Sequence, residues 1–145
     1  MASYLFETDE HKTLRQQTRK WATAAIKPHA HDWDMKGEFP RELYADAAEA
    51  GVLAVGYPTE YGGAGGDLTH VVVSSEEMIL AGHSVGAVVG LGSHGIALPP
   101  ILKFGTHDQK ERFVRPALEG KLVSALAITE PGGGSDVAGL RTKAV

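Results

Sequence analysis

The stretch that decides the fold lies near the end of the sequence: Ala127-Ile128-Thr129-Glu130-Pro131-Gly132-Gly133-Gly134-Ser135-Asp136-Val137-Ala138-Gly139. An apolar run that suits a strand breaks here into three consecutive glycines. Glycine permits positive φ and close approach of the backbone, so successive N–H groups can converge on an anion, and Ser135 adds a hydroxyl donor. The pattern predicts a phosphate-binding turn at the end of a strand. The ordered set of Thr, Glu, Gly, Ser and Asp is far more specific than a glycine triplet alone.

Upstream of this turn, the sequence predicts a succession of helices. Apolar residues recur at helical spacing after Thr8 and after Asp67, and both residue types cap helices well. Pro40 suits the first turn of another helix, and Gly51 suits its end. The expected helices cover residues 8–26, 40–50, 67–82, 84–104 and 106–119.

The helix expected over residues 84–104 is apolar on most sides, as in a helix buried within a bundle. Pro99 and Pro100 should disturb its middle or mark a boundary. Thr106 and Gln109 fit a capping box for the last helix. The glycine-rich stretch 56–66 should form a loop.

From residue 121 the pattern changes to short extended segments. Residues 122–128 form an apolar run bounded by turn residues, and residues 140–145 begin another. A strand at the end of the sequence has no visible partner for its backbone hydrogen bonds. We therefore predict a mainly α fold, with an N-terminal helical-bundle domain over residues 1–120 and the first strands of a truncated β-domain over residues 121–145.

Composition excludes several classes of function. The net charge of −4 and the absence of a Lys/Arg cluster argue against a nucleic-acid surface. The chain has no Cys, so disulfides and thiolate chemistry are excluded. The first residues lack the pattern of a signal peptide, so we expect a cytoplasmic protein. No run approaches the ~18 apolar residues of a membrane span, so we expect no such span.

The motif over residues 129–136 resembles the acyl-CoA dehydrogenase family. The loop Tyr61-Gly62-Gly63-Ala64-Gly65 and the helix start Phe104-Gly105-Thr106-His107-Asp108-Gln109-Lys110 look like further landmarks of that family, and the resemblance runs from Phe6 to Val145. The family has an N-terminal helical domain, a β-domain that opens with this motif, and a C-terminal helical bundle that is absent here. The resemblance implies FAD as cofactor, an acyl-CoA substrate, an electron-transferring flavoprotein as acceptor, and a homo-oligomer at full length.

The resemblance also implies roles for individual residues. Leu126, Ile128 and Thr129 would line the flavin, and Gly134 and Ser135 would contact the pyrophosphate, with Ser135 also at the substrate. A purely structural glycine turn is the alternative.

Two further glycines and one carboxylate need separate assignments. Gly92 and Gly95 would border the acyl-chain cavity of the family. Glu130 tempts assignment as the catalytic base, but the family's base is a Glu of the C-terminal bundle. We therefore expect no catalytic residue in this chain and a structural role for Glu130.

Two other motifs do not fit their usual functions. Gly90-Leu91-Gly92-Ser93-His94-Gly95 spells a dinucleotide fingerprint, but the prolines that follow exclude the uninterrupted helix that NAD binding requires. His29-Ala30-His31-Asp32-Trp33-Asp34 has only spacing in favour of a metal site, so we expect a solvated loop and no metal.

Two alternatives to the dehydrogenase remain open from the sequence. An acyl-CoA oxidase would keep the fold and the cofactor but use oxygen as the electron acceptor. A short, non-catalytic module that binds acyl-CoA or supports assembly would need only the helical domain.

Overall fold

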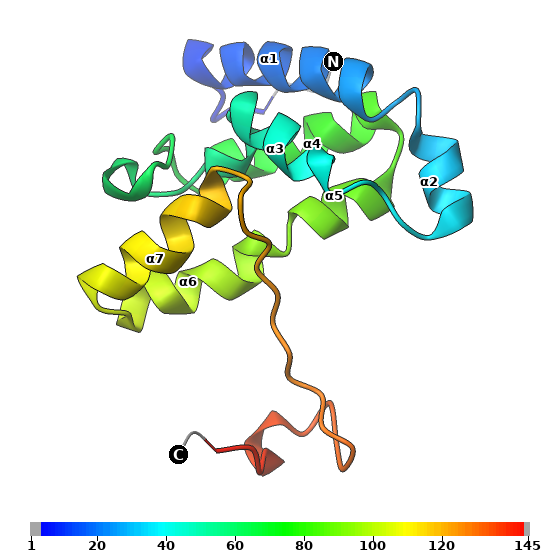
Figure 1. Ribbon diagram of the computed structural model, residues 1–145. Helices are drawn as coiled ribbons and strands as arrows, with labels where there is room; N and C mark the ends of the chain where they lie inside the picture. Colours follow the sequence, from blue (N-terminus) through cyan, green and yellow to red (C-terminus); the bar gives the residue numbers. More distant parts are fainter. Residues whose placement is uncertain (1–3, 144–145) are drawn as a thin grey trace.

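The computed structural model describes residues 4–143 as a helical domain from which a long extended segment projects (Figure 1). Seven α-helices and three 3₁₀ turns occur within these residues, and no β-strand does. The helices are α1 (Asp9–Ala25), α2 (Ala30–Lys36), α3 (Glu42–Glu49), α4 (Leu68–Gly82), α5 (Val85–Leu91), α6 (His94–Phe104) and α7 (His107–Leu118). The 3₁₀ turns are η1 (Val52–Ala54), η2 (Thr59–Tyr61) and η3 (Val137–Gly139). The mainly helical prediction is therefore confirmed.

Helix α1 packs along α4 through a buried ion network. The guanidinium of Arg15 lies 2.6 Å from a Glu7 carboxylate oxygen, 2.7 Å from one of Glu76 and 3.2 Å from one of Glu77. The Arg15 side chain is 5% exposed and that of Glu77 is 1% exposed, so these charges are satisfied by each other and not by water. Arg19 also contacts Glu77. The hydrogen bond from Arg15 lowers the pKa of Glu7.

We predict that Arg15→Ala lowers the free energy of unfolding by about 3 kcal/mol at pH 7, because it leaves the buried carboxylate of Glu7 without its cation and leaves Glu77 with Arg19 alone. The pKa of Glu7 lies below its ordinary value of 4.5 in the folded state. Its contribution is therefore present above pH 4.5 and is lost as the pH falls through the lowered pKa. Denaturant titrations should show the gap between wild type and variant narrowing below pH 4.5.

Lys12→Ala is the matched control for this prediction. Lys12 lies on the same helix and pairs with Asp9, but both side chains are mostly exposed. Loss of the Lys12 side chain should leave the free energy of unfolding almost unchanged, both at pH 7 and below pH 4.5. An equal loss in the two variants would contradict the buried network.

The buried apolar residues form two cores within the helical domain. The first joins α1, α3, η1 and α5 through the residues Ala22, Ile26, Leu43, Tyr44, Ala47, Leu53, Ala87 and Leu91. The second joins α6, α7 and η2 through Tyr61, Leu98, Val114, Ala117 and Leu118. Helix α5 belongs to the first core and α6 to the second, so this consecutive pair links the two.

The expected single helix over residues 84–104 is divided in two. The break falls at Gly92 and Ser93, between α5 and α6, whereas Pro99 and Pro100 lie inside α6. Glycine is a poor helix former, so the chain turns there, and the prolines cost α6 only local backbone bonds.

The same stretch also corrects the expectation that no run approaches the length and apolar character of a membrane span. Val85–Phe104 is long enough and apolar enough, with mean hydropathy 1.5, to cross a membrane by length and composition alone. The stretch is divided into two helices, with Leu91 in the first core and Leu98 in the second, but only 28% of it is buried, so packing within residues 4–143 accounts for only part of this composition.

The loop expected over residues 29–34 is not formed, and this prediction was wrong. These residues lie mostly in α2, which ends at Gly37 with φ of 72°. Trp33 packs against the first core, and its ring lies 6.1 Å from the ring of Phe39. A helix of seven residues is too short to show a clear apolar period, so the glycine after Lys36 was the available signal.

Gly120 ends α7 in a conformation that favours glycine. Its φ is 69°, and a Cβ at this position would lie 2.5 Å from the carbonyl oxygen of Tyr44 and 2.8 Å from the Cα of Ala45. The chain therefore leaves α7 in contact with the backbone of α3, and the start of the extended segment is fixed.

We predict that Gly120→Ala lowers the free energy of unfolding by about 3 kcal/mol, from backbone strain and the clash with α3 together. Gly37→Ala is the control, because Gly37 has a φ of 72° and a Cβ there would meet no other atom within 4 Å. It should cost about 1 kcal/mol, from strain alone. Thermal unfolding of both variants measures the difference, and equal losses would show that the close approach to α3 is unimportant.

Candidate functional site

The extended segment carries the residues predicted to bind the flavin. Leu126 is 50% exposed and Ile128 is 36% exposed, and Thr129 is also exposed. The strand expected over residues 122–128 is not formed, and neither is one over 140–143, while residues 144–145 lie outside the described residues. The physical reason is the absence of a pairing partner: no backbone hydrogen bond reaches residues 123–129 in the described part of the chain.

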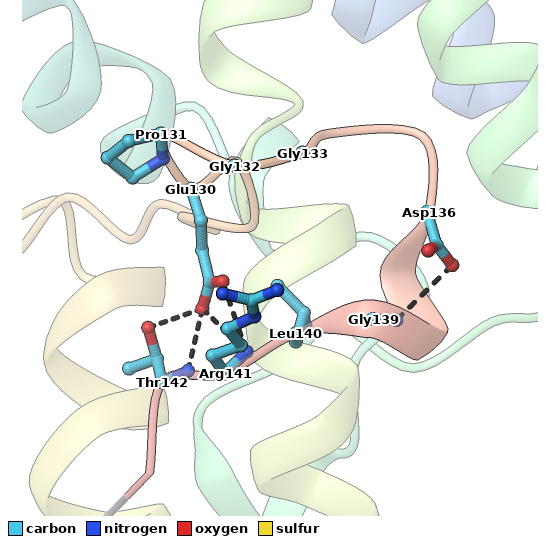
Figure 2. Close-up of a pocket in the computed structure, with 9 residues that line it drawn as sticks. All are labelled: Glu130, Pro131, Gly132, Gly133, Asp136, Gly139, Leu140, Arg141 and Thr142. Atoms are coloured by element: carbon cyan, nitrogen blue, oxygen red, sulfur yellow. Dashed lines mark hydrogen bonds between the residues drawn. The ribbon is translucent and has the colours of Figure 1, made fainter.

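The carboxylate of Glu130 closes the loop that follows. It accepts hydrogen bonds from the backbone N–H of Arg141 at 3.0 Å and of Thr142 at 2.7 Å, and from the Thr142 hydroxyl (Figure 2). These bonds, with the Thr142 hydroxyl first, lower the pKa of Glu130. Its lone pairs are engaged with the loop, so the geometry fits the structural role expected for this residue.

A hollow of about 520 Å³ lies between the two arms of this loop (Figure 2). Pro131, Gly132, Gly133 and Leu140 line it together with Glu130. Gly134 and Ser135 do not line it, although the sequence assigned them to the pyrophosphate.

The glycine turn differs from the expected turn in one respect. Positive φ occurs at seven glycines of the described residues, and Gly132, Gly133 and Gly134 are not among them. A Cβ at Gly132 or Gly133 would have no neighbour within 4 Å, so packing within the described residues does not require glycine at either position. Close approach of an anion to this backbone stays a prediction.

A second cavity, of about 190 Å³ and partly open to solvent, lies between elements of the helical domain. Gly92 and Gly95 line it, as do Val71, Ser75 and Met78 of α4. Gly95 has open space where a Cβ would lie, whereas a Cβ at Gly92 would lie 3.0 Å from the carbonyl oxygen of Val88. The structure therefore brings the two glycines of the predicted acyl site to one apolar cavity.

Besides Ser75, two further polar side chains line the same cavity, those of Tyr57 and His94, and the sequence indicated neither. Burial raises the pKa of Tyr57 to about 12 and lowers the pKa of His94. His94 is 2% exposed, its Nδ1 lies 2.5 Å from the Ser124 hydroxyl, and its Nε2 is buried without a partner. No sequence pattern marks His94, because its partner lies thirty residues away along the chain.

One cluster of metal-ligand types occurs among residues 4–143, and the sequence did not predict it. His11, Asp67 and His70 place ligand atoms within 4.8 Å of one another. His11 Nδ1 accepts from the Thr8 N–H and His11 Nε2 contacts the Thr69 hydroxyl, while Asp67 caps α4 and its N–H donates to His70 Nδ1. Hydrogen bonds from Thr69, its hydroxyl first, and from His70 lower the pKa of Asp67. Helix capping therefore accounts for the cluster.

Comparison with known proteins identifies the domain. Residues 8–121 match the model of the acyl-CoA dehydrogenase N-terminal domain. The chain belongs to the acyl-CoA dehydrogenase family. It is 36% identical over 137 residues to the mitochondrial long-chain specific acyl-CoA dehydrogenase of Mus musculus, a match that covers 94% of this chain and 31% of the relative.

Solved structures agree with this acyl-CoA dehydrogenase assignment. A Mycobacterium smegmatis protein assigned as an acyl-CoA dehydrogenase matches with a TM-score of 0.90 and 46% identity, over 97% of this chain and 37% of that one. An acyl-CoA dehydrogenase of Bacillus anthracis, complexed with FAD, matches with a TM-score of 0.78 and 31% identity, over 93% and 23%. The chain thus spans about a third of the length of the curated relatives it matches.

The extended segment fits a flavin by its chemistry. The backbone N–H and C=O groups of residues 123–129 are not used within the described chain, and Thr129 adds a hydroxyl. A flavin ring has both donors and acceptors at its polar edge, so such a segment can bind it. The roles of Leu126, Ile128, Thr129, Gly134 and Ser135 remain predictions.

We predict that Glu130→Gln in the full-length protein keeps the rate of flavin reduction within about tenfold of wild type but weakens FAD retention. A catalytic base would lose about 10²- to 10⁴-fold in rate on the same substitution. Glu130→Ala, which removes every acceptor for Arg141 and Thr142, should weaken FAD retention further. Rapid-mixing kinetics at saturating acyl-CoA measure the rate, and a loss of about 10²-fold or more in the Gln variant would assign Glu130 to the chemistry.

Proposed function

We propose that this chain is the N-terminal part of an FAD-dependent acyl-CoA dehydrogenase, which desaturates an acyl-CoA thioester between its α and β carbons. The observation that carries the proposal is the combination of an apolar cavity beside Gly92 and Gly95 with an extended segment whose backbone is free to bind a flavin. The family match and the FAD complex of the Bacillus anthracis relative support it.

The residues of this chain would bind and orient, and would not react. The cavity between α4, α5 and α6 would hold the acyl chain in an apolar environment that excludes water. Leu126 and Ile128 through their backbone, and Thr129 through its hydroxyl, would fix the plane of the flavin. Bound FAD would supply the hydride acceptor. The base that takes the α-proton would lie outside this chain.

We propose an electron-transferring flavoprotein as the electron acceptor. The alternative is oxygen, which would make the full-length protein an acyl-CoA oxidase. The two differ in what reoxidises the reduced flavin. Cytoplasmic residence and assembly into a homo-oligomer stay predictions of the sequence.

The test is anaerobic mixing of the full-length, FAD-loaded protein with saturated acyl-CoA thioesters of increasing length. Bleaching of the flavin absorbance and formation of the 2-enoyl thioester are the expected results. Subsequent admission of oxygen should leave the flavin reduced until an electron-transferring flavoprotein is added; rapid reoxidation with hydrogen peroxide would favour the oxidase. If the full-length protein binds acyl-CoA but no flavin, the result would favour the alternative of a non-catalytic module that binds acyl-CoA.

Filling the cavity should shorten the range of accepted substrates. We predict that Gly92→Phe lowers kcat/KM selectively for long-chain acyl-CoAs and leaves short-chain substrates nearly unaffected. Gly95→Leu is the second variant, because its Cβ enters open space and the helix need not move. Equal losses at all chain lengths in both variants would show that this cavity does not hold the acyl chain.

A further inference from the structure

His94 lies at the junction between the two parts of the proposed site. It opens α6 directly after the break at Gly92 and Ser93, and it lines the cavity that those helices enclose. Its ring packs edge-on against Tyr44 of the first core, with 5.5 Å between the ring centres. A polar ring in this position is held from several sides, since only 2% of the residue is exposed.

The partner of His94 comes from the extended segment. Within residues 4–143, the hydrogen bond between His94 Nδ1 and the Ser124 hydroxyl is the one that joins residues 123–143 to the helices. Before residue 123, the last backbone hydrogen bond to the helices is the one that the Leu122 N–H donates to the Pro116 carbonyl. Figure 1 shows the segment leaving the helical domain and running away from it.

Ser124 lies two residues before Leu126 and five before Thr129. An extended chain advances about 3.3 Å per residue, so a bond at Ser124 restricts the position of Leu126 to within about 7 Å and still leaves Thr129 free to adjust. Ser124 and Leu126 also point to the same face of an extended chain, because side chains alternate.

We propose that His94 is a positioning residue that ties the flavin-binding segment to the wall of the acyl cavity through Ser124. The proposal rests on the proposed function, which assigns the cavity to the acyl chain and the extended segment to the flavin. Its content is geometric: one buried ring contacts the cavity that would hold the acyl chain and the segment that would hold the flavin. Loss of the bond should allow the segment to move relative to the cavity.

Burial favours this role for histidine. It lowers the pKa of His94, so the ring is neutral at pH 7 and offers one donor and one acceptor. Asn can supply the same polar contact near the position of Nδ1, whereas Leu fills the volume without it.

The experiment measures FAD binding and backbone exchange in the full-length protein. Ser124→Ala and His94→Leu should each raise the FAD dissociation constant about three- to tenfold, the effect of one lost hydrogen bond. Each should also speed hydrogen exchange of the amides of residues 123–129 in the apoprotein, where no flavin is present. In Ser124→Ala the KM for acyl-CoA should change less than about twofold, because Ser124 does not line the acyl cavity.

A double-mutant cycle distinguishes anchoring from general damage. The double variant should lose no more than either single variant, because both remove the same bond. His94→Asn should recover FAD binding to within about twofold of wild type, since it restores a polar partner for Ser124. Ser93→Ala is the matched control, since the neighbouring Ser93 hydroxyl is also buried but has no partner, and its removal should leave FAD binding unchanged.

Two results would overturn the proposal. One is an unchanged FAD dissociation constant and unchanged exchange in Ser124→Ala, the milder substitution. The other is full additivity of the two variants. If wild-type protein binds no FAD at all, the proposed function fails, and the exchange measurement on the apoprotein still decides whether His94 holds the segment.

Discussion

The position of α4 depends on a buried cation. Arg15 contacts Glu7, Glu76 and Glu77, and the side chains of Arg15 and Glu77 are almost entirely removed from water. A buried ion pair adds little net stability, but removing one member leaves uncompensated charge, so the pairing of α1 with α4 is fixed in register. Thr18 and Ser74, whose hydroxyls lie 3.5 Å apart, continue the same contact further along both helices.

This constraint reaches the proposed acyl site through another face of α4. Val71, Ser75 and Met78 recur at helical spacing and line the cavity, while Glu76 and Glu77 contact α1. Because α4 is held against α1 by its charged face, the position of its apolar face at the cavity is fixed as well. The ion network between α1 and α4 thus positions one wall of the proposed acyl cavity.

The sequence predicted most of the helical domain and less of the rest. Thr8, Asp67 and the pair Thr106 with Gln109 are local signals, and each stands at the start of a helix as expected. Features set by distant contacts were not predictable, such as the contact of His94 with Ser124. The break between α5 and α6 falls at Gly92 and not at the prolines. When both halves of an apolar stretch pack into cores, its hydrophobic pattern does not show where one helix ends and the next begins.

The extended segment shows a different limit. Residues 122–128 have the composition of a strand, and a strand needs a neighbour to accept its hydrogen bonds. Within residues 4–143 there is no such neighbour, so the same sequence is extended but unpaired. The motif from Thr129 to Asp136 therefore indicated the family more directly than it indicated the local structure, since its three glycines have ordinary φ values.

We propose that this chain forms one part of a larger flavoprotein, and native mass spectrometry of the protein isolated from its source would test this. We expect a subunit of more than twice the 15.4 kDa of this chain, carrying FAD. A subunit of 15.4 kDa that carries no flavin would contradict it.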